Sequence, residues 1–225
     1  MSDLNQLLLN FKFKRNFKED DFYVGKSNYY PYKLITTWPK WEKNFLNIYG
    51  DKYSGKTHLS NIFLKKFKGI KIDSHSLKDI NFKELKVNEN IILDNFNENI
   101  DQTLAYSLFN LIEQDNKYLI VNSVEPITKF DFKLNDLQSR TKNFLIAKID
   151  KPDDELMFAL ILKNFSDRQI VIDKKLIDFI IKRVERSYGK IFEFIYKIDK
   201  ISLKKKKPID FKIINEALEN KNEQI

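Results

Sequence analysis

Hydrophobic residues along the chain gather in short runs that alternate with longer amphipathic stretches. Runs of five or six mostly apolar residues have the length and composition of buried strands. In the stretches between them, apolar residues recur three or four positions apart, as on one face of a helix. Strands that alternate with helices predict an α/β fold with a parallel sheet covered on both faces. The strands are expected at residues 45–49, 69–73, 90–95, 118–122 and 144–149.

This alternation stops after Pro152, where the remaining pattern is amphipathic throughout. The apolar spacing there predicts four helices and no strand, which is typical of a small helical domain. A change of pattern of this kind marks a domain boundary. We therefore divide the chain into a tail at 1–20, a sheet domain at 21–150 and a helical domain at 151–225. The four helices are expected at residues 153–167, 173–186, 190–203 and 210–219.

Finer expectations concern the ends and faces of the helices. A helix before the first strand is expected to end at Pro39, because proline cannot continue it. Gly69 is expected to cap the helix after the first strand, and residues 74–90 to form one helical turn and a loop. The helix at 101–115 is expected to bury one face, made of Leu104, Leu108, Leu111 and Ile112.

Composition and charge narrow the class of protein without naming a function. With 225 residues, 42% hydrophobic and 32% charged, the chain is expected to fold as a soluble globule. It shows no signal peptide and no apolar run near the roughly 20 residues of a membrane span, so we expect no membrane partner. The absence of cysteine excludes disulfides and suits the cytoplasm. A net charge of +8 permits attraction to nucleic acid or to an acidic protein but establishes neither.

One octet carries the clearest chemical signature, because it fits the phosphate-binding pattern G-x-x-x-x-G-K-[ST]. It lies between the strand at 45–49 and a helix expected to bury Leu59, Ile62, Phe63 and Phe67, which is the context that the motif needs. Its backbone N–H groups could face a phosphate, its lysine could reach the β- and γ-phosphates, and its threonine could bind Mg²⁺. The alternative is a glycine turn before an ordinary helix. The octet is Gly50, Asp51, Lys52, Tyr53, Ser54, Gly55, Lys56 and Thr57.

A P-loop also needs an acidic residue at the tip of a neighbouring strand to hold Mg²⁺. Asp94, which follows the apolar residues 91–93, is the candidate. Hydrolysis usually requires a further carboxylate that orients or activates water. The next residue is Asn95, which cannot take a proton, so we expect slow or absent intrinsic hydrolysis. The two histidines, His58 and His75, have no partner at metal-ligand spacing and are expected to be ordinary surface or near-loop residues.

The tail holds a short apolar segment, residues 6–11, before a mostly polar and basic stretch. Such a segment outside a core often docks on another protein. Leu7, Leu9 and Phe11 could fill an apolar pocket while Gln6 makes hydrogen bonds. The alternative is a strand or helix that packs on its own domain, which composition alone favours.

Taken in order, the motifs resemble the AAA+ ATPase domain of the bacterial replication initiator DnaA, and more closely the Hda-type homologues that inactivate it. The segment at 22–28 resembles a family segment beside the adenine, with Phe22, Val24 and Asn28 at the matching positions. Residues 50–57 and 91–94 resemble the Walker A and Walker B motifs of the family. Asn95 stands where the initiator has a second acid.

Further positions follow from the same resemblance. Residues 137–140 resemble the segment that carries the arginine finger, on Arg140, and residues 152–155 resemble the start of the helical lid. Lys190, which the resemblance places at the nucleotide, stands where sensor II usually has arginine. Sensor I falls at Val124, which has no polar group, although Asn122 or Ser123 could substitute.

The resemblance implies a sheet of order 5-1-4-3-2 followed by an all-α lid, with ADP or ATP and Mg²⁺ as cofactors. It implies that residues 6–11 bind the DNA polymerase sliding clamp, which reaches DNA indirectly, and that Arg140 acts in trans on DnaA. Such a protein is a negative regulator of replication initiation, and it could also be a homo-oligomer. The Hda-type interpretation is favoured because the chain ends after the lid, without the DNA-reading helix-turn-helix of the initiator.

Other functions stay open. One is an AAA+ helicase-loader-like or DNA-binding remodelling ATPase, which the net charge of +8 supports and residues 6–11 do not. Another is a P-loop kinase, which would need a catalytic acid or an arginine-rich phosphate lid, and neither is evident. A scaffold that binds nucleotide only for stability is a third, because Asn95, Val124 and Lys190 depart from a working ATPase pattern. The basic run at 204–207 is expected to be a solvated loop.

Overall fold

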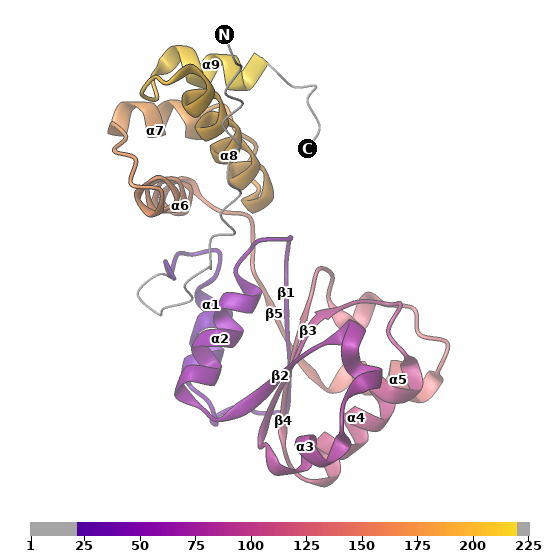
Figure 1. Cartoon of the computed structure of the whole chain (residues 1–225). Coiled ribbons are helices and arrows are strands. Elements are labelled where there is room, and N and C mark those ends of the chain that lie inside the picture. Colours follow the sequence, from indigo (N-terminus) through magenta and orange to yellow (C-terminus); the bar gives the residue numbers. More distant parts are fainter. Residues whose placement is uncertain (1–21, 220–225) are drawn as a thin grey trace, which may run out of the picture.

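The structure, a computed structural model, describes residues 22–219 of the chain (Figure 1). Its centre is a five-stranded sheet in which every neighbouring pair of strands is parallel. The strand order is β2-β3-β4-β1-β5, which is the predicted order 5-1-4-3-2 read from the other edge. The predicted α/β fold class is therefore confirmed. The strands are β1 (Phe45–Tyr49), β2 (Gly69–Asp73), β3 (Asn90–Phe96), β4 (Tyr118–Ser123) and β5 (Phe144–Lys148).

The helices follow the amphipathic pattern but differ from the prediction at several ends. The first helix already ends at Thr36, ahead of Pro39. Residues 74–90 hold two short helices instead of one turn and a loop, and the basic run at 204–207 begins inside a helix. The α-helices and the 3-10 helices, marked η, are α1 (Tyr29–Thr36), α2 (Lys56–Lys66), η2 (Ser74–Asp79), α3 (Phe82–Val87), α4 (Gln102–Gln114), η3 (Ile127–Lys129), α5 (Asn135–Arg140), η4 (Thr141–Asn143), α6 (Asp154–Asp167), α7 (Lys174–Ile181), α8 (Tyr188–Lys205) and α9 (Phe211–Glu219).

Both faces of the sheet are buried, as the sequence predicts. Successive side chains of a strand point to opposite faces. In β3, Leu93 therefore packs in the cluster that includes α4 and α5, whereas Ile92 packs in the cluster that includes α1 and α2. Figure 1 shows these two pairs of helices on opposite sides of the sheet. The loop between β1 and α2 consequently lies on the α1–α2 side.

The core face of α4 is rotated from the predicted one. Leu108 and Ile112 are fully buried as expected, but Ala105 and Phe109 are buried as well. Leu104 and Leu111, which were predicted to be core residues, are only half-buried. The buried residues are spaced as i, i+3, i+4 and i+7, which is the stripe of a helix that lies flat on a sheet.

Gly69 does not cap α2, because the C-cap of that helix is Phe67, in an extended conformation. Gly69 is instead the first residue of β2, and it faces Asn90 on β3. A Cβ atom at Gly69 would overlap the carbonyl oxygen of Asn90. The glycine is thus required by close approach of two strands and not by helix capping.

We expect Gly69→Ala to lower the free energy of unfolding by about 2 kcal/mol, because the added methyl group must push β2 from β3. Gly25→Ala is the matched control, since a Cβ atom there has Leu156 as its nearest neighbour, at an ordinary 3.8 Å. Urea unfolding of both variants measures the difference. Equal stability of the two variants would contradict the packing argument.

The helices after β5 form a second core, which is the predicted helical region. Its fully buried residues include Met157, Ile161 and Ile195. This region also packs on the sheet domain, because Leu156 and Tyr188 belong to the same cluster as α1 and α2. The Tyr188 hydroxyl donates to the carbonyl oxygen of Asp150 at 3.0 Å, and burial raises the pKa of Tyr188 to about 12. The first turn of α8 is therefore fixed against the end of the sheet domain.

The end of the sheet domain lies between β5, which ends at Lys148, and α6, which begins at Asp154. The predicted tail, with Gln6, Leu7, Leu9 and Phe11, lies outside the described residues. Within residues 22–219, no helix is both long and apolar enough to cross a lipid bilayer.

Candidate nucleotide-binding site

The loop that joins β1 to α2 has the backbone of a phosphate cradle. Three of its residues have positive φ: Gly50 at 154°, Tyr53 at 67° and Gly55 at 98°. A Cβ atom at Gly50 would lie 2.7 Å from the carbonyl oxygen of Ile149, so this position needs glycine. Gly55 is the N-cap of α2, and no side chain among the described residues caps the helix there. The first N–H groups of α2 are therefore available to an anion.

Lys56 folds back across this loop. Its Nζ donates to the carbonyl oxygens of Gly50, at 2.7 Å, and Asp51, at 2.8 Å, and lies 3.4 Å from the Ser54 hydroxyl. Burial lowers the pKa of Lys56 to about 8, although the charges of Asp94 and Asp51 oppose this change. Uncharged oxygens bind an ammonium group less strongly than phosphate oxygens do. A phosphate in the cradle would therefore stabilise the charged form of Lys56.

The two predicted magnesium ligands lie together. Thr57 Oγ1 donates to Asp94 Oδ2 at 3.0 Å, although the two residues are on different elements. Asp94 is 6% exposed. The residues from 22 to 219 contain no group of three or more His, Cys, Asp or Glu side chains that could hold a metal ion. One hydroxyl and one carboxylate fit Mg²⁺, which is usually held by few protein oxygens together with phosphates and water.

Asn122 is the polar residue of β4 that reaches this site. Its Nδ2 donates to Asp94 Oδ1 at 3.1 Å and to Ser60 Oγ at 2.7 Å. Its side chain is fully buried, and its Oδ1 accepts no hydrogen bond from the described residues. Ser123 is engaged elsewhere, since it donates to the Glu125 carbonyl oxygen and accepts from Asn47. Of the two predicted substitutes for Val124, which is 47% exposed, Asn122 is therefore the one that contacts Asp94.

The segment at 22–28 closes one side of the cradle. The ring of Phe22 lies against Gly55, where an added Cβ atom would be 3.0 Å from it. The same ring packs edge-on to His58, with 5.2 Å between the centroids. His58 is thus half-buried beside the loop and His75 is exposed, which agrees with the prediction that the two histidines occupy near-loop or surface positions.

Asn28 and Val24 have different surroundings from Phe22. The Asn28 side chain is buried and braces its own segment, accepting from the Gly25 N–H at 2.8 Å and donating to the Tyr23 carbonyl oxygen at 2.9 Å. Val24 is 36% exposed. The hydrogen bonds of Asn28 therefore stabilise the conformation of its own segment. The contact of these residues with an adenine stays a prediction.

The N-terminus of α8 faces the tip of the loop. The Tyr53 ring lies 6.0 Å from the Phe192 ring, and a Cβ atom added at Gly189 would lie 3.4 Å from the Tyr53 ring. Lys190 is exposed, and its Nζ donates to Glu193 on its own helix at 2.8 Å, which raises the pKa of Lys190. Lys190 therefore lies on the helix that contacts the loop, but its ammonium group pairs with Glu193 of the same helix. Its role at the nucleotide stays a prediction.

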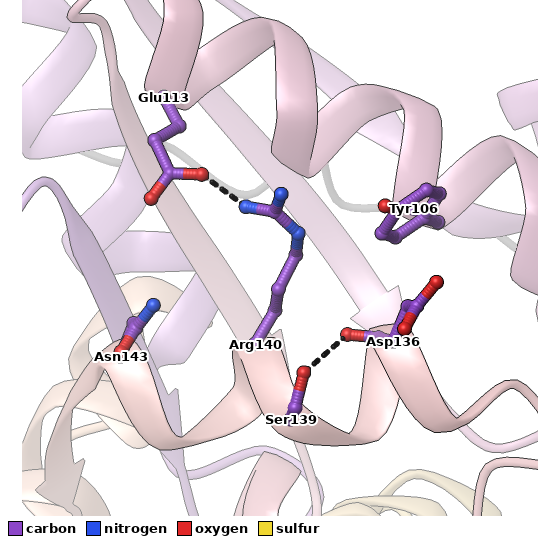
Figure 2. A pocket seen from close by; sticks show the side chains of 6 residues that line it. All are labelled: Tyr106, Glu113, Asp136, Ser139, Arg140 and Asn143. Carbon is purple, nitrogen blue, oxygen red and sulfur yellow. Dashed lines mark hydrogen bonds and ion pairs between the residues drawn. The ribbon is translucent and has the colours of Figure 1, made fainter.

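Arg140 lies away from its own cradle, at the end of α5. Helix α5 packs on the α4 side of the sheet, whereas α2 packs on the other side. Figure 2 shows the Arg140 guanidinium paired with Glu113 of α4, and the group also lies 5.3 Å from the Tyr106 ring centroid. Glu113 raises the pKa of Arg140. These residues line a pocket of about 300 Å³ together with Asp136, Ser139 and Asn143.

The sheet order, the loop after β1, the acid on β3 and the helical region after β5 together match the AAA+ fold of DnaA domain III. Solved structures agree: domain III of DnaA from Thermotoga maritima superposes with a TM-score of 0.75 at 21% identity, over 92% of this chain and 98% of that one. AMPPCP-bound DnaA from Aquifex aeolicus superposes with a TM-score of 0.63 at 22% identity, over 80% and 64%. The chain therefore has the fold of DnaA domain III.

The sequence is similar to DnaA as well. It is 24% identical over 227 residues to the chromosomal replication initiator protein DnaA of Caldanaerobacter subterraneus subsp. tengcongensis, covering 89% of this chain and 51% of the relative. The chain thus spans about half the length of the curated relatives that it matches. No family model matches the chain.

Proposed function

We propose that this chain is a nucleotide-binding regulator of replication initiation of the Hda type. In this proposal it binds ADP or ATP with Mg²⁺ at residues 50–57, docks on the sliding clamp through residues 6–11, and stimulates ATP hydrolysis by DnaA. The observation that carries the proposal is that the phosphate cradle and Arg140 belong to helices on opposite faces of the sheet. Helix α2, which begins with Lys56 and Thr57, packs on one face of the sheet, whereas α5, which ends at Arg140, packs on the other face. Arg140 would therefore meet the nucleotide of a partner and not the one in its own cradle.

The cradle is better suited to holding a nucleotide than to cleaving it. Lys56 and the N-terminus of α2 would hold the β- and γ-phosphates, and Thr57 and Asp94 would hold Mg²⁺, which neutralises phosphate charge when bound. Asn95, which follows Asp94, offers an amide in place of a carboxylate. An amide cannot accept the proton of an attacking water, so hydrolysis in this site is slow.

Arg140 would act on the nucleotide of DnaA. A guanidinium stays charged and presents fixed donors to phosphate oxygens, so it stabilises the charge that develops during phosphoryl transfer. To reach a partner it must exchange the Glu113 carboxylate for phosphate oxygens. Because Glu113 is half exposed, the pair is accessible from the surface, and such an exposed pair contributes only about 0–1 kcal/mol.

The clamp part of the proposal is tested by capture on purified sliding clamp. We expect the intact chain to be captured, and Gln6→Ala and Leu9→Ala to lose capture, because they remove the hydrogen-bonding and apolar anchors of the segment. Phe17→Ala is the control, since it removes an apolar side chain from the same tail outside the motif. Unchanged capture of both motif variants would contradict the proposal.

The second candidate is a DNA-binding remodelling or helicase-loader-like ATPase, which the net charge of +8 favours. Cations that contact phosphates make binding fall steeply with salt. Salt-sensitive binding of single-stranded DNA without clamp capture is the result that would select this candidate over the first.

A further inference from the structure

Strand β3 is irregular directly after the acid of the nucleotide site. Its pairing with β4 shifts register between Leu93 and Phe96, which is the mark of a β-bulge. Within the bulge, Asn95 has a φ of 58°, in the left-handed region that asparagine tolerates better than most residues. The bulge leaves the Asn95 side chain exposed at the same edge as Asp94 and turned toward β2.

Four hydrogen bonds hold Asn95 in this conformation. Its Nδ2 donates to Asp73 Oδ2 at the end of β2, with 2.5 Å between the atoms. Its carbonyl oxygen accepts from Ser74 Oγ at 2.6 Å and from Asn97 Nδ2 at 3.0 Å. Its own N–H donates to Asp94 Oδ1 at 3.1 Å. Asn95 therefore links the end of β2 to the acid of the cradle.

Asp73 is fixed on both of its carboxylate oxygens. While Oδ2 accepts from Asn95, Oδ1 accepts from the His75 N–H at 2.9 Å and so caps η2. An ionised carboxylate can only accept hydrogen bonds, so its neighbour must be a donor. An aspartate at position 95 would bring two carboxylates into contact, and like charges at this separation repel strongly.

We propose that Asp73 is a positioning residue that selects an amide over a carboxylate at position 95, and that this amide keeps the cradle from hydrolysing its own ATP. This inference rests on the proposed binding of ATP at residues 50–57. In hydrolysis, the oxygen of water bonds to the γ-phosphorus and the bond to the β–γ bridging oxygen breaks, which releases ADP and inorganic phosphate. A carboxylate beside Asp94 would orient this water and accept its proton, and Asp73 excludes one there by holding the Asn95 amide.

Exchanging the two side chains tests the proposal, because the double variant Asp73→Asn/Asn95→Asp keeps one donor, one acceptor and the same net charge. We expect it to hydrolyse bound ATP about 100-fold faster than the wild type, a gain typical of an added general base. Its ATP affinity and melting temperature should stay near those of the wild type. Asn95→Asp alone should melt at a lower temperature and gain less than a tenth of the increase in rate.

Four proteins are compared: the wild type, both single variants and the double variant. For each protein we measure single-turnover hydrolysis of MgATP with protein in excess, ATP affinity by titration, and the melting temperature. Asp73→Asn alone should leave the hydrolysis rate unchanged, since position 95 still carries an amide. A double variant no faster than the wild type would overturn the proposal. So would Asn95→Asp alone if it matched the double variant in rate and melting temperature, because Asp73 would then exert no control.

Failure of this inference differs from failure of the proposed function. If Asp73 has no such role, the wild type still binds ATP and is still captured by the clamp. If the wild type binds no ATP, the titration shows this before any hydrolysis is measured, and both proposals are overturned.

Discussion

Replacing Lys56 with alanine is expected to weaken the binding of ADP and ATP by at least about 100-fold, or about 2.7 kcal/mol. The partly buried ammonium group is held by carbonyl oxygens of the loop itself, so it already points across the cradle. Charge-assisted hydrogen bonds to phosphate contribute about 1.5–3 kcal/mol each, and the variant removes all of those made by Lys56. Titration of the purified variant with a fluorescent nucleotide measures the loss.

The matched control is Lys68→Ala. It removes the same charge from an exposed position beyond the far end of α2, so it separates loss of the cradle contact from loss of net charge. Affinity within about twofold of the wild type is expected. If the two variants bind nucleotide equally well, Lys56 does not hold the phosphates.

The lowered pKa of Lys56 adds a pH dependence with a definite sign. Phosphate binds the ammonium form, so a bound nucleotide raises this pKa above the value of about 8. Below pH 8 the lysine already carries its proton, and the affinity is expected to be nearly constant. Above pH 8 binding must take up a proton, so the affinity should fall by up to about tenfold per pH unit. Lys56→Ala should remove this slope.

Replacing Arg140 with alanine is expected to lower the stimulation of DnaA-bound ATP hydrolysis by about 1000-fold, the lower end of what an arginine finger contributes. Because Arg140 lies on the sheet face opposite α2, the variant should keep its own nucleotide affinity and its capture by the clamp. The assay follows phosphate release from ATP-loaded DnaA in the presence of clamp on DNA.

Lys142→Ala is the control for this prediction, since it removes a cation from an exposed position in the neighbouring η4. Stimulation close to that of the wild type is expected from it. Full stimulation by Arg140→Ala would show that the pair with Glu113 is a structural contact of α4 and α5 and nothing more.

Local pattern was sufficient to predict the strands and the phosphate loop. Each strand is a short apolar run, and the loop is defined by eight consecutive residues, so neither depends on distant contacts. The contact between Thr57 and Asp94 can also be predicted from the sequence, because the carboxyl ends of parallel strands meet at one edge of the sheet. The sheet order came from the resemblance and not from periodicity.

The parts that the sequence did not predict depend on contacts between distant residues. The Asp73–Asn95 pair requires a bulge in β3 and a positive φ, for which an apolar run gives no signal. His58 is half-buried because Phe22 folds over Gly55, a contact that helical spacing does not reveal. The sequence offers one clue to the Asp73–Asn95 pair. An asparagine directly follows the acid of the motif, and an aspartate ends the neighbouring strand.

The buried face of α4 differs from the predicted face for a similar reason. Leucine spacing alone selected Leu104 and Leu111, whereas contact with the sheet selects the stripe that contains Ala105 and Phe109. The position of the sheet therefore determines which of two adjacent stripes is buried, and periodicity cannot distinguish them.

Calorimetric titration of the intact chain with MgADP and with MgATP tests most directly whether residues 50–57 bind a nucleotide. The predicted result is saturable binding of one nucleotide per chain, with the heat lost in Lys56→Ala and kept in Lys68→Ala. A flat titration of the intact, folded chain at millimolar nucleotide would contradict it.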